Sequence, residues 1–270
     1  MIPLMMRQPA IYLPHGGGPC FFMEWTMGPA DTWKRTEAWL RSIASSLPEA
    51  PKAILVISAH WEEEVPTVLT AAQPPLLFDY YGFPEHTYEL TWPAAGSPPL
   101  AARVVELLAD AGIATKQNDA RGFDHGVFVP LKVAFPEAQI PTVQLSMRAG
   151  LDPAEHLAIG RALAPLRDEG VLIIGSGMSY HNMRGFYTAA GDTDSKRFDA
   201  WLSSSIAKSP SERDALLRDW ARAPAARASH PREEHLVPLM VAAGAAGADL
   251  GVRVFNDAPM GTVISAVRFG

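Results

Sequence analysis

The sequence predicts one α/β domain over residues 1–270, with a central mixed β-sheet flanked by helices. Short β-branched runs alternate along the chain with amphipathic segments, a pattern typical of sheets covered by helices. Of the 270 residues, 48% are hydrophobic, so the chain can bury a large core. No internal repeat, low-complexity tract or obvious linker divides it. These three observations favour a single domain.

The strands are expected where short runs are rich in β-branched residues. Several of these runs are apolar without interruption, which is typical of strands buried on both faces. In chain order, the expected strands are residues 10–13, 53–58, 67–71, 142–147, 171–176, 252–256 and 262–269.

Amphipathic segments between these strands predict helices at residues 31–47, 97–112, 152–170 and 233–247. The third has Asp152 as N-cap, Pro153 at its first position and Gly170 at its end. Another helix is expected to open at His125, with Asp124 in the N-cap position. The polar region 183–229 also has a helical pattern and predicts a helical lid or excursion.

Charge and cysteine content exclude several classes of function. The net charge is −6 and the 23 basic residues are spread along the chain, so we expect no nucleic-acid partner and no membrane partner. Cys20 is the only cysteine, which excludes internal disulfides and thiolate clusters. The segment 1–17 contains one arginine, is broken by Pro14 and lacks a small-residue cleavage site. We therefore expect a cytoplasmic protein without a leader.

Four histidines stand close to the ends of predicted elements. His15, His60 and His181 each follow a strand, and His125 opens a helix. In α/β sheets, ligands bind beyond the carboxyl ends of the strands, where loops and helix N-termini converge. The three glycines after His15 allow close approach of a bound ion, and no Lys-Ser/Thr sequel supports a phosphate loop. We therefore expect a metal site at the carboxyl ends of the strands.

The segment SHPREEHLVPL offers a further ligand. His230 and His235 are five residues apart, so on one helix their side chains would diverge by about 140°, and only one of them is expected to bind the ion. A carboxylate from Glu233 or Glu234 with two imidazoles would form the facial triad of non-heme iron enzymes. Both carboxylates also suit the first turn of a helix, which favours negative charge.

Six motifs together resemble a known family. PHGGGP, SAHW, DYYGFPEHTYELTWPAAGSP, GFDHGVFVPLKVAFPEAQIPTVQLS, SGMSYHN and HPREEHLVPLM occur in the order and approximate spacing of the class III extradiol ring-cleavage dioxygenases. The resemblance covers roughly residues 10–270 and is to the branch that includes 4,5-DOPA dioxygenase. It implies that His15, His60 and His235 hold one metal ion, with Glu234 as the alternative third ligand.

The resemblance also implies a pair of histidines beside the metal that do not bind it. His181 is expected to accept a phenolic proton of a catechol, because a neutral imidazole titrates close to working pH. His125 is expected to donate a hydrogen bond or proton to the reduced oxygen, with Asp124 or the helix terminus fixing its tautomer. The implied reaction is the extradiol (meta) cleavage of a catechol-type ring by O₂, giving a ring-opened semialdehyde.

Substrate contacts are expected in the aromatic segment 78–92, which resembles the family's loop over the ring pocket. The alternative is a surface loop pinned by its own aromatic side chains. The candidates for ring contact are Tyr80, Tyr81, Phe83 and His86. Arg121 and Arg184 are candidates for pairing with a substrate carboxylate. The alternative for each is an ordinary surface arginine.

The resemblance implies Fe(II) as the metal for activity, although Zn(II) can occupy three imidazoles equally well. The alternative function is therefore a zinc-dependent hydrolase or a non-redox metal-binding protein on the same fold. An oxygenase requires both His125 and His181 to face the open side of the metal, whereas a hydrolase favours one carboxylate beside a bound water. The expected partners are a small catechol and O₂, and homo-oligomerisation is left open.

Overall fold

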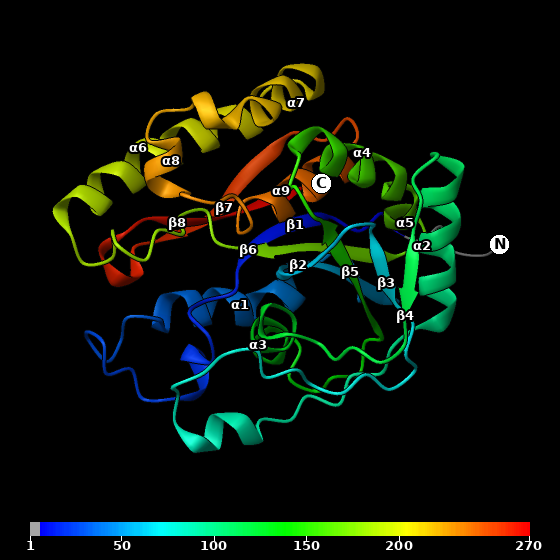
Figure 1. Ribbon diagram of the computed structural model, residues 1–270, viewed down its shortest axis with the longest axis horizontal. Coiled ribbons are helices and arrows are strands. Elements are labelled where there is room, and N and C mark those ends of the chain that lie inside the picture. Colours follow the sequence, from blue (N-terminus) through cyan, green and yellow to red (C-terminus); the bar gives the residue numbers. More distant parts are fainter. Residues whose placement is uncertain (1–5) are drawn as a thin grey trace.

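The computed structural model describes residues 6–270, which form a sheet of eight strands with helices on both faces (Figure 1). Residues 1–5, part of the segment in which no leader is expected, lie outside the described residues. The strands are β1 (Ala10–Pro14), β2 (Ala53–Glu63), β3 (Thr67–Leu69), β4 (Lys116–Asn118), β5 (Thr142–Arg148), β6 (Val171–Gly177), β7 (Gly251–Asp257) and β8 (Ile264–Phe269).

The strand order is β4-β3-β5-β2-β6-β1-β8-β7. Its centre is parallel, because β2 pairs with β5 and β6, and β6 pairs with β1. Antiparallel pairs flank this centre, β3 with β5 on one side and β8 with β1 and β7 on the other. The mixed sheet confirms the predicted fold class. The carboxyl ends of β1, β2 and β6 lie at one edge of the sheet, where the site is built.

Two apolar layers enclose the sheet, because successive side chains of a strand point to opposite faces. Tyr12 of β1 packs among the helices of one layer, and Ile11 and Leu13 pack against those of the other. Figure 1 shows α1 and α3 together on one side of the sheet. The helices are α1 (Lys34–Ser46), α2 (Pro98–Asp110), α3 (His125–Ala134), α4 (Pro153–Leu163), α5 (Pro165–Asp168), α6 (Ala189–Ile206), α7 (Pro210–Arg218), α8 (Ala226–Ser229) and α9 (Val237–Ala245).

All nine residues of α9 are buried, which agrees with its sequence VPLMVAAGA being apolar all round. It lies against α4 and the central strands. Among residues 6–270, no helix is both long and apolar enough to cross a bilayer. Burial of α9 therefore results from its position in the core of the domain.

The structure corrects several boundaries. The helix expected over 152–170 divides into α4 and α5 at Pro165, which cannot donate a backbone hydrogen bond. Asp152 does cap α4, accepting from the backbone of Ala154 and Glu155. The helix expected from residue 233 begins only at Val237. The short strand β4 was not predicted, because its three-residue sequence KQN is polar and contains no β-branched residue.

The region 183–229 is helical, as expected, and contains α6, α7 and α8. Phe198 and Leu202 of α6 are fully buried in the core. Only the segment before α6 reaches the cavity described below, through Met183, Phe186 and Tyr187. Most of the region therefore completes the core on the side of β7 and β8.

Candidate metal centre and ring pocket

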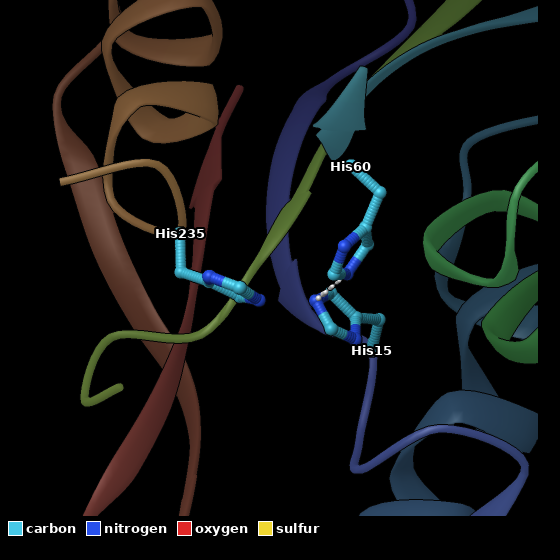
Figure 2. A group of neighbouring side chains, drawn as sticks. All are labelled: His15, His60 and His235. Carbon is cyan, nitrogen blue, oxygen red and sulfur yellow. Dashed lines mark hydrogen bonds between the residues drawn. The ribbon is translucent and has the colours of Figure 1, made fainter. Parts of the chain in front are cut away.

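His15 and His60 meet at the carboxyl edge of the sheet. His15 follows the last residue of β1, is 2% exposed and donates its backbone N–H to the carbonyl of Gly177 at 3.1 Å. The Nε2 atoms of His15 and His60 lie 3.3 Å apart, the contact marked by the dashed line in Figure 2. The predicted approach of these two side chains is therefore present in the structure.

His60 lies inside β2, which runs five residues beyond the predicted end. Residues 57 and 62 of β2 pair with residues 145 and 147 of β5, so regular pairing is interrupted between them. Such irregularities redirect side chains at the edges of sheets and beside active sites. The interruption contains His60, whose ring turns toward His15 (Figure 2).

His235 approaches from the turn before α9. Its carbonyl accepts hydrogen bonds from the hydroxyl of Tyr12 at 2.7 Å and from the backbone of Met178 at 3.1 Å. A Cβ at Gly177 would lie 2.1 Å from this carbonyl oxygen, so only glycine permits the approach. The side chain of Tyr12 in β1 and the backbone at the end of β6 therefore fix the position of His235.

The three rings form one cluster. Their candidate ligand atoms all lie within 4.8 Å of one another, and the ring centroids of His15 and His235 are 5.2 Å apart. Burial and the neighbouring histidines lower the pKa of His15 and of His235 well below the usual range, and burial lowers that of His60 to about 3. All three imidazoles are therefore neutral at pH 7 and offer lone pairs.

These residues fit a metal ion. Two neutral Nε2 atoms 3.3 Å apart cannot both carry a proton toward each other, whereas one ion satisfies both. Two nitrogens each bound at about 2.1 Å lie about 3.0 Å apart at a right angle and about 3.4 Å apart at the tetrahedral angle. The observed contact falls within that range. Three imidazoles suit zinc and iron.

Glu234 lies behind two of the histidines. Its Oε1 is 2.9 Å from Nδ1 of His235 and 3.2 Å from Nδ1 of His181, whose rings stack with centroids 3.4 Å apart. Burial raises the pKa of Glu234, but the hydrogen bond and charge of His181 outweigh it and leave the pKa below its usual value. The ionised carboxylate accepts Nδ1–H from both rings and directs their Nε2 atoms away from itself. His181, Glu234 and His235 also form a second group able to hold an ion.

His125 is held by a residue that the sequence analysis missed. Asp79 Oδ1 accepts from the backbone nitrogen of His125 at 2.9 Å and lies 2.8 Å from its Nδ1. Burial raises the pKa of Asp79, but the contacts with His125 outweigh it and lower the pKa. The ring centroids of His125 and His60 are 3.9 Å apart. Asp79 stands in the aromatic segment 78–92, which also contains Glu85 and Glu89, so no local signal separated it from the other two carboxylates.

The expectation that Asp124 orients His125 is corrected. Asp124 occupies the N-cap position of α3, but its carboxylate makes no capping hydrogen bond. It accepts instead from Ser58 at 2.7 Å and from Arg121 at 3.1 Å. Asp124 is fully buried, which raises its pKa, and it ties α3 to β2. Its role in the structure is to hold the elements that carry His60 and His125.

The five histidines line one cavity of about 400 Å³. His15 and His235 are buried at its floor, and its outer wall consists of glycine, methionine and aromatic residues. The remaining lining residues are Gly16, Gly17, Gly18, Trp25, Met27, Phe83, Met178, Met183, Phe186, Tyr187 and Met260.

Of the expected ring contacts, Phe83 lines this cavity. Tyr80 is buried behind His125, with ring centroids 5.8 Å apart, and donates its hydroxyl to the carbonyl of Thr87. Tyr81 is 92% exposed and His86 bonds the carbonyl of Phe22, and neither is among the lining residues.

His230 lies apart from the cluster. Its Nε2 is 2.9 Å from the carbonyl of Ser179, and its ring packs against Phe198 and Trp220. Burial lowers its pKa to about 3. His230 and His235 are on opposite sides of a turn and share no helix, so the turn brings only His235 to the cluster.

Several known proteins are similar to this chain. Residues 9–268 match the family described as the catalytic LigB subunit of aromatic ring-opening dioxygenase. Dioxygenase tasH of Hapsidospora irregularis is 37% identical over 97% of this chain and 85% of that protein. The 4,5-DOPA dioxygenase extradiol of Beta vulgaris is 40% identical over 86% of each chain, and that of Escherichia coli K12 is 36% identical over 88% of this chain and 85% of that one.

The fold is also shared with a solved structure. The crystal structure of an uncharacterized protein from Escherichia coli K12 covers 98% of this chain and 100% of its own, with a TM-score of 0.75 and 30% sequence identity. The family match covers almost the whole chain, and these curated relatives share more than a third of the aligned residues. The chain therefore belongs to the LigB family and is an aromatic ring-opening dioxygenase.

Proposed function

We propose that this dioxygenase cleaves a catechol-type ring in the extradiol manner, at one metal ion held by His15, His60 and His235. The observation that carries the proposal is the convergence of these three neutral imidazoles on the floor of a cavity that His125 and His181 also line. Extradiol cleavage is the activity that the names of several relatives print. The product is a ring-opened semialdehyde that contains both atoms of O₂.

We propose Fe(II) as the active metal, with Zn(II) able to occupy the same ligands. Bound Fe(II) would supply the redox chemistry that O₂ needs to react with an aromatic ring, which redox-inert zinc does not supply. Glu234 is assigned the role of orienting His235, since its Oε1 contacts the Nδ1 of that ring. The ligand set therefore consists of three histidines.

His181 is the base that prepares the substrate. With its Nδ1–H donated to Glu234, its Nε2 carries a lone pair and lines the cavity. It accepts the phenolic proton when the catechol binds, and the carboxylate of Glu234 stabilises the resulting imidazolium. One carboxylate thus holds a ligand and a base together.

His125 holds a proton on the other side of the cluster. The Asp79 carboxylate fixes its ring through Nδ1 and stabilises its protonated form, by the same contact that orients the neutral ring. His125 therefore donates a hydrogen bond or proton to substrate oxygen.

The proposal is tested by loading the metal-free protein anaerobically with Fe(II) and admitting air with a panel of catechols. Oxygen uptake should match the appearance of the yellow semialdehyde, and zinc-loaded protein should show neither. His60→Ala should abolish both signals, whereas His86→Ala, which removes a histidine outside the cavity lining, should retain them. Iron binding without oxygen uptake on any catechol would refute the proposal.

A further inference from the structure

The mouth of the cavity is apolar and exposed. Met27, Met183 and Tyr187 are 55%, 71% and 51% exposed, and all three line the cavity that reaches the buried histidines. Met260 and Phe186 extend this wall. Large apolar side chains that are exposed together around a cavity indicate a binding surface, whereas single exposed ones are ordinary. Flexible thioethers also make favourable contacts with aromatic rings.

The wall offers no partner for a negative charge. Among the described residues that line the cavity, none is lysine, arginine, aspartate or glutamate. Arg121 is committed elsewhere, since it donates to Asp124 and to the carbonyl of His60 and stacks over Trp61. Arg184 follows Met183 in the chain, is exposed, and is not a lining residue.

The charges nearest the floor are negative. Asp79 contacts His125, and Glu234 contacts His181 and His235, so a carboxylate stands directly behind each side of the cluster. The cation nearest to Glu234, Arg232, is 3.6 Å from it, donates to Glu62 and is half-exposed outside the lining. An anionic substituent at the mouth would therefore lose hydration without gaining an ion pair with a lysine or arginine.

We infer that the catechol taken by this site carries an uncharged, apolar ring substituent, which lies against Met27, Met183 and Tyr187 at the mouth. This inference rests on the proposed function and names its substrate class. It distinguishes the chain from relatives whose names print DOPA, an amino acid that bears a carboxylate and an ammonium group. The apolar wall selects by contact, since one methylene in an apolar pocket changes kcat/KM by roughly 10-fold or more.

The test compares 4-propylcatechol with 3-(3,4-dihydroxyphenyl)propionate, in which a carboxylate replaces the terminal methyl group. Calorimetry on zinc-loaded protein, which does not turn the ligands over, measures both dissociation constants. We expect 4-propylcatechol to bind at least 10-fold more tightly than the propionate. Equal or tighter binding of the propionate, or no binding of 4-propylcatechol, would overturn the inference.

Two variants locate the effect. Met183→Arg places a cation at the mouth and should tighten propionate binding about 10-fold, whereas Leu250→Arg, an equal change at a 52% exposed residue outside the cavity, should not. An unchanged ratio in Met183→Arg would contradict contact of the substituent with the mouth. If the parent protein prefers the propionate and Arg184→Ala removes that preference, Arg184 selects the substrate and the inference is wrong.

Turnover separates this inference from the function on which it rests. Fe(II)-loaded protein that opens neither ring would refute extradiol cleavage, while the ratio of dissociation constants on zinc-loaded protein still decides the charge preference. Ring opening with a higher kcat/KM for the propionate or for DOPA would leave the proposed function intact and refute the inference.

Discussion

Asp79 holds His125 by two atoms at once, since its Oδ1 lies 2.9 Å from the backbone nitrogen and 2.8 Å from Nδ1 of that histidine. The two contacts fix both the start of α3 and the rotation of the ring. Because the contact also favours one tautomer, Asp79 connects a loop of the aromatic segment 78–92 to the chemistry of the cavity.

We expect Asp79→Asn to lower kcat by about 10²-fold, because loss of the charge removes the support for a protonated His125. The metal content and the KM for the catechol should stay near the parent values. A double-mutant cycle with His125→Phe provides the control: if Asp79 acts through His125, adding Asp79→Asn to His125→Phe costs little further activity. Independent losses would place the effect of Asp79 elsewhere.

Glu234→Gln should weaken metal binding by roughly 10- to 100-fold, since an amide is a poorer acceptor for Nδ1–H of His235. It should also lower kcat, because His181 loses the same acceptor. Competition with a chelator measures the first effect, and turnover at saturating metal measures the second. Glu233→Gln is the matched control, since Glu233 bonds Arg227 instead and should leave both values unchanged.

Gly177→Ala is expected to destabilise the protein by about 3 kcal/mol and to displace His235. The added Cβ would lie 2.1 Å from a carbonyl oxygen, which is backbone and cannot turn away. Gly17→Ala should cost less, because the nearest atom to its added Cβ is in the Trp33 ring at 3.5 Å, an ordinary van der Waals contact. Thermal unfolding of the two variants tests this order, and a milder effect at Gly177 would contradict it.

The metal-free protein should lose stability as the pH falls. In the unfolded chain a histidine has a pKa near 6.5. In the folded chain, burial lowers the pKa of both His60 and His230 to about 3. A depressed pKa stabilises the fold above pH 6.5, and this contribution is lost as the pH falls toward 3. Burial likewise lowers the pKa values of His15, His156 and His235.

Urea midpoints between pH 7 and pH 4 measure this loss. Asp124 acts in the opposite direction, because burial raises its pKa, but it is one group against several histidines. The decline should be delayed in zinc-loaded protein, since the bound metal competes with protons for the same nitrogens. A midpoint that does not change from pH 7 to pH 4 would contradict the neutral, buried state of these rings.

The sequence was sufficient to predict the α/β fold and the approach of His15 to His60, because strand ends in a mostly parallel sheet meet at one edge. His235 follows no strand, and only the family resemblance singled it out from His230 and the neighbouring glutamates. The sequence did not predict how His60 is aimed, since the interruption of β2 depends on pairing with β5 and has no local signal. It also gave no means of separating Tyr80 from Tyr81, because neighbouring tyrosines in a loop have no periodicity that distinguishes the buried one.

Asp79 was missed for a related reason. Its partner His125 is 46 residues away in the chain, and both lie outside the strands that position the other histidines. The acidic residue next to His125 in sequence, Asp124, was the expected partner. Its carboxylate points instead to Ser58 and Arg121, so adjacency in sequence did not predict the contact.

The strand order has a consequence for synthesis on the ribosome. His15 follows β1 and His60 lies in β2, but β6 stands between these strands in the sheet, and His235 comes still later. A nascent chain therefore contains His15 and His60 before β6, the strand that lies between β1 and β2 in the sheet, has been translated. Domains generally fold as units during synthesis, and this cluster can close only after His235 has left the exit tunnel. Truncated translation products contain the first motifs and lack the assembled centre.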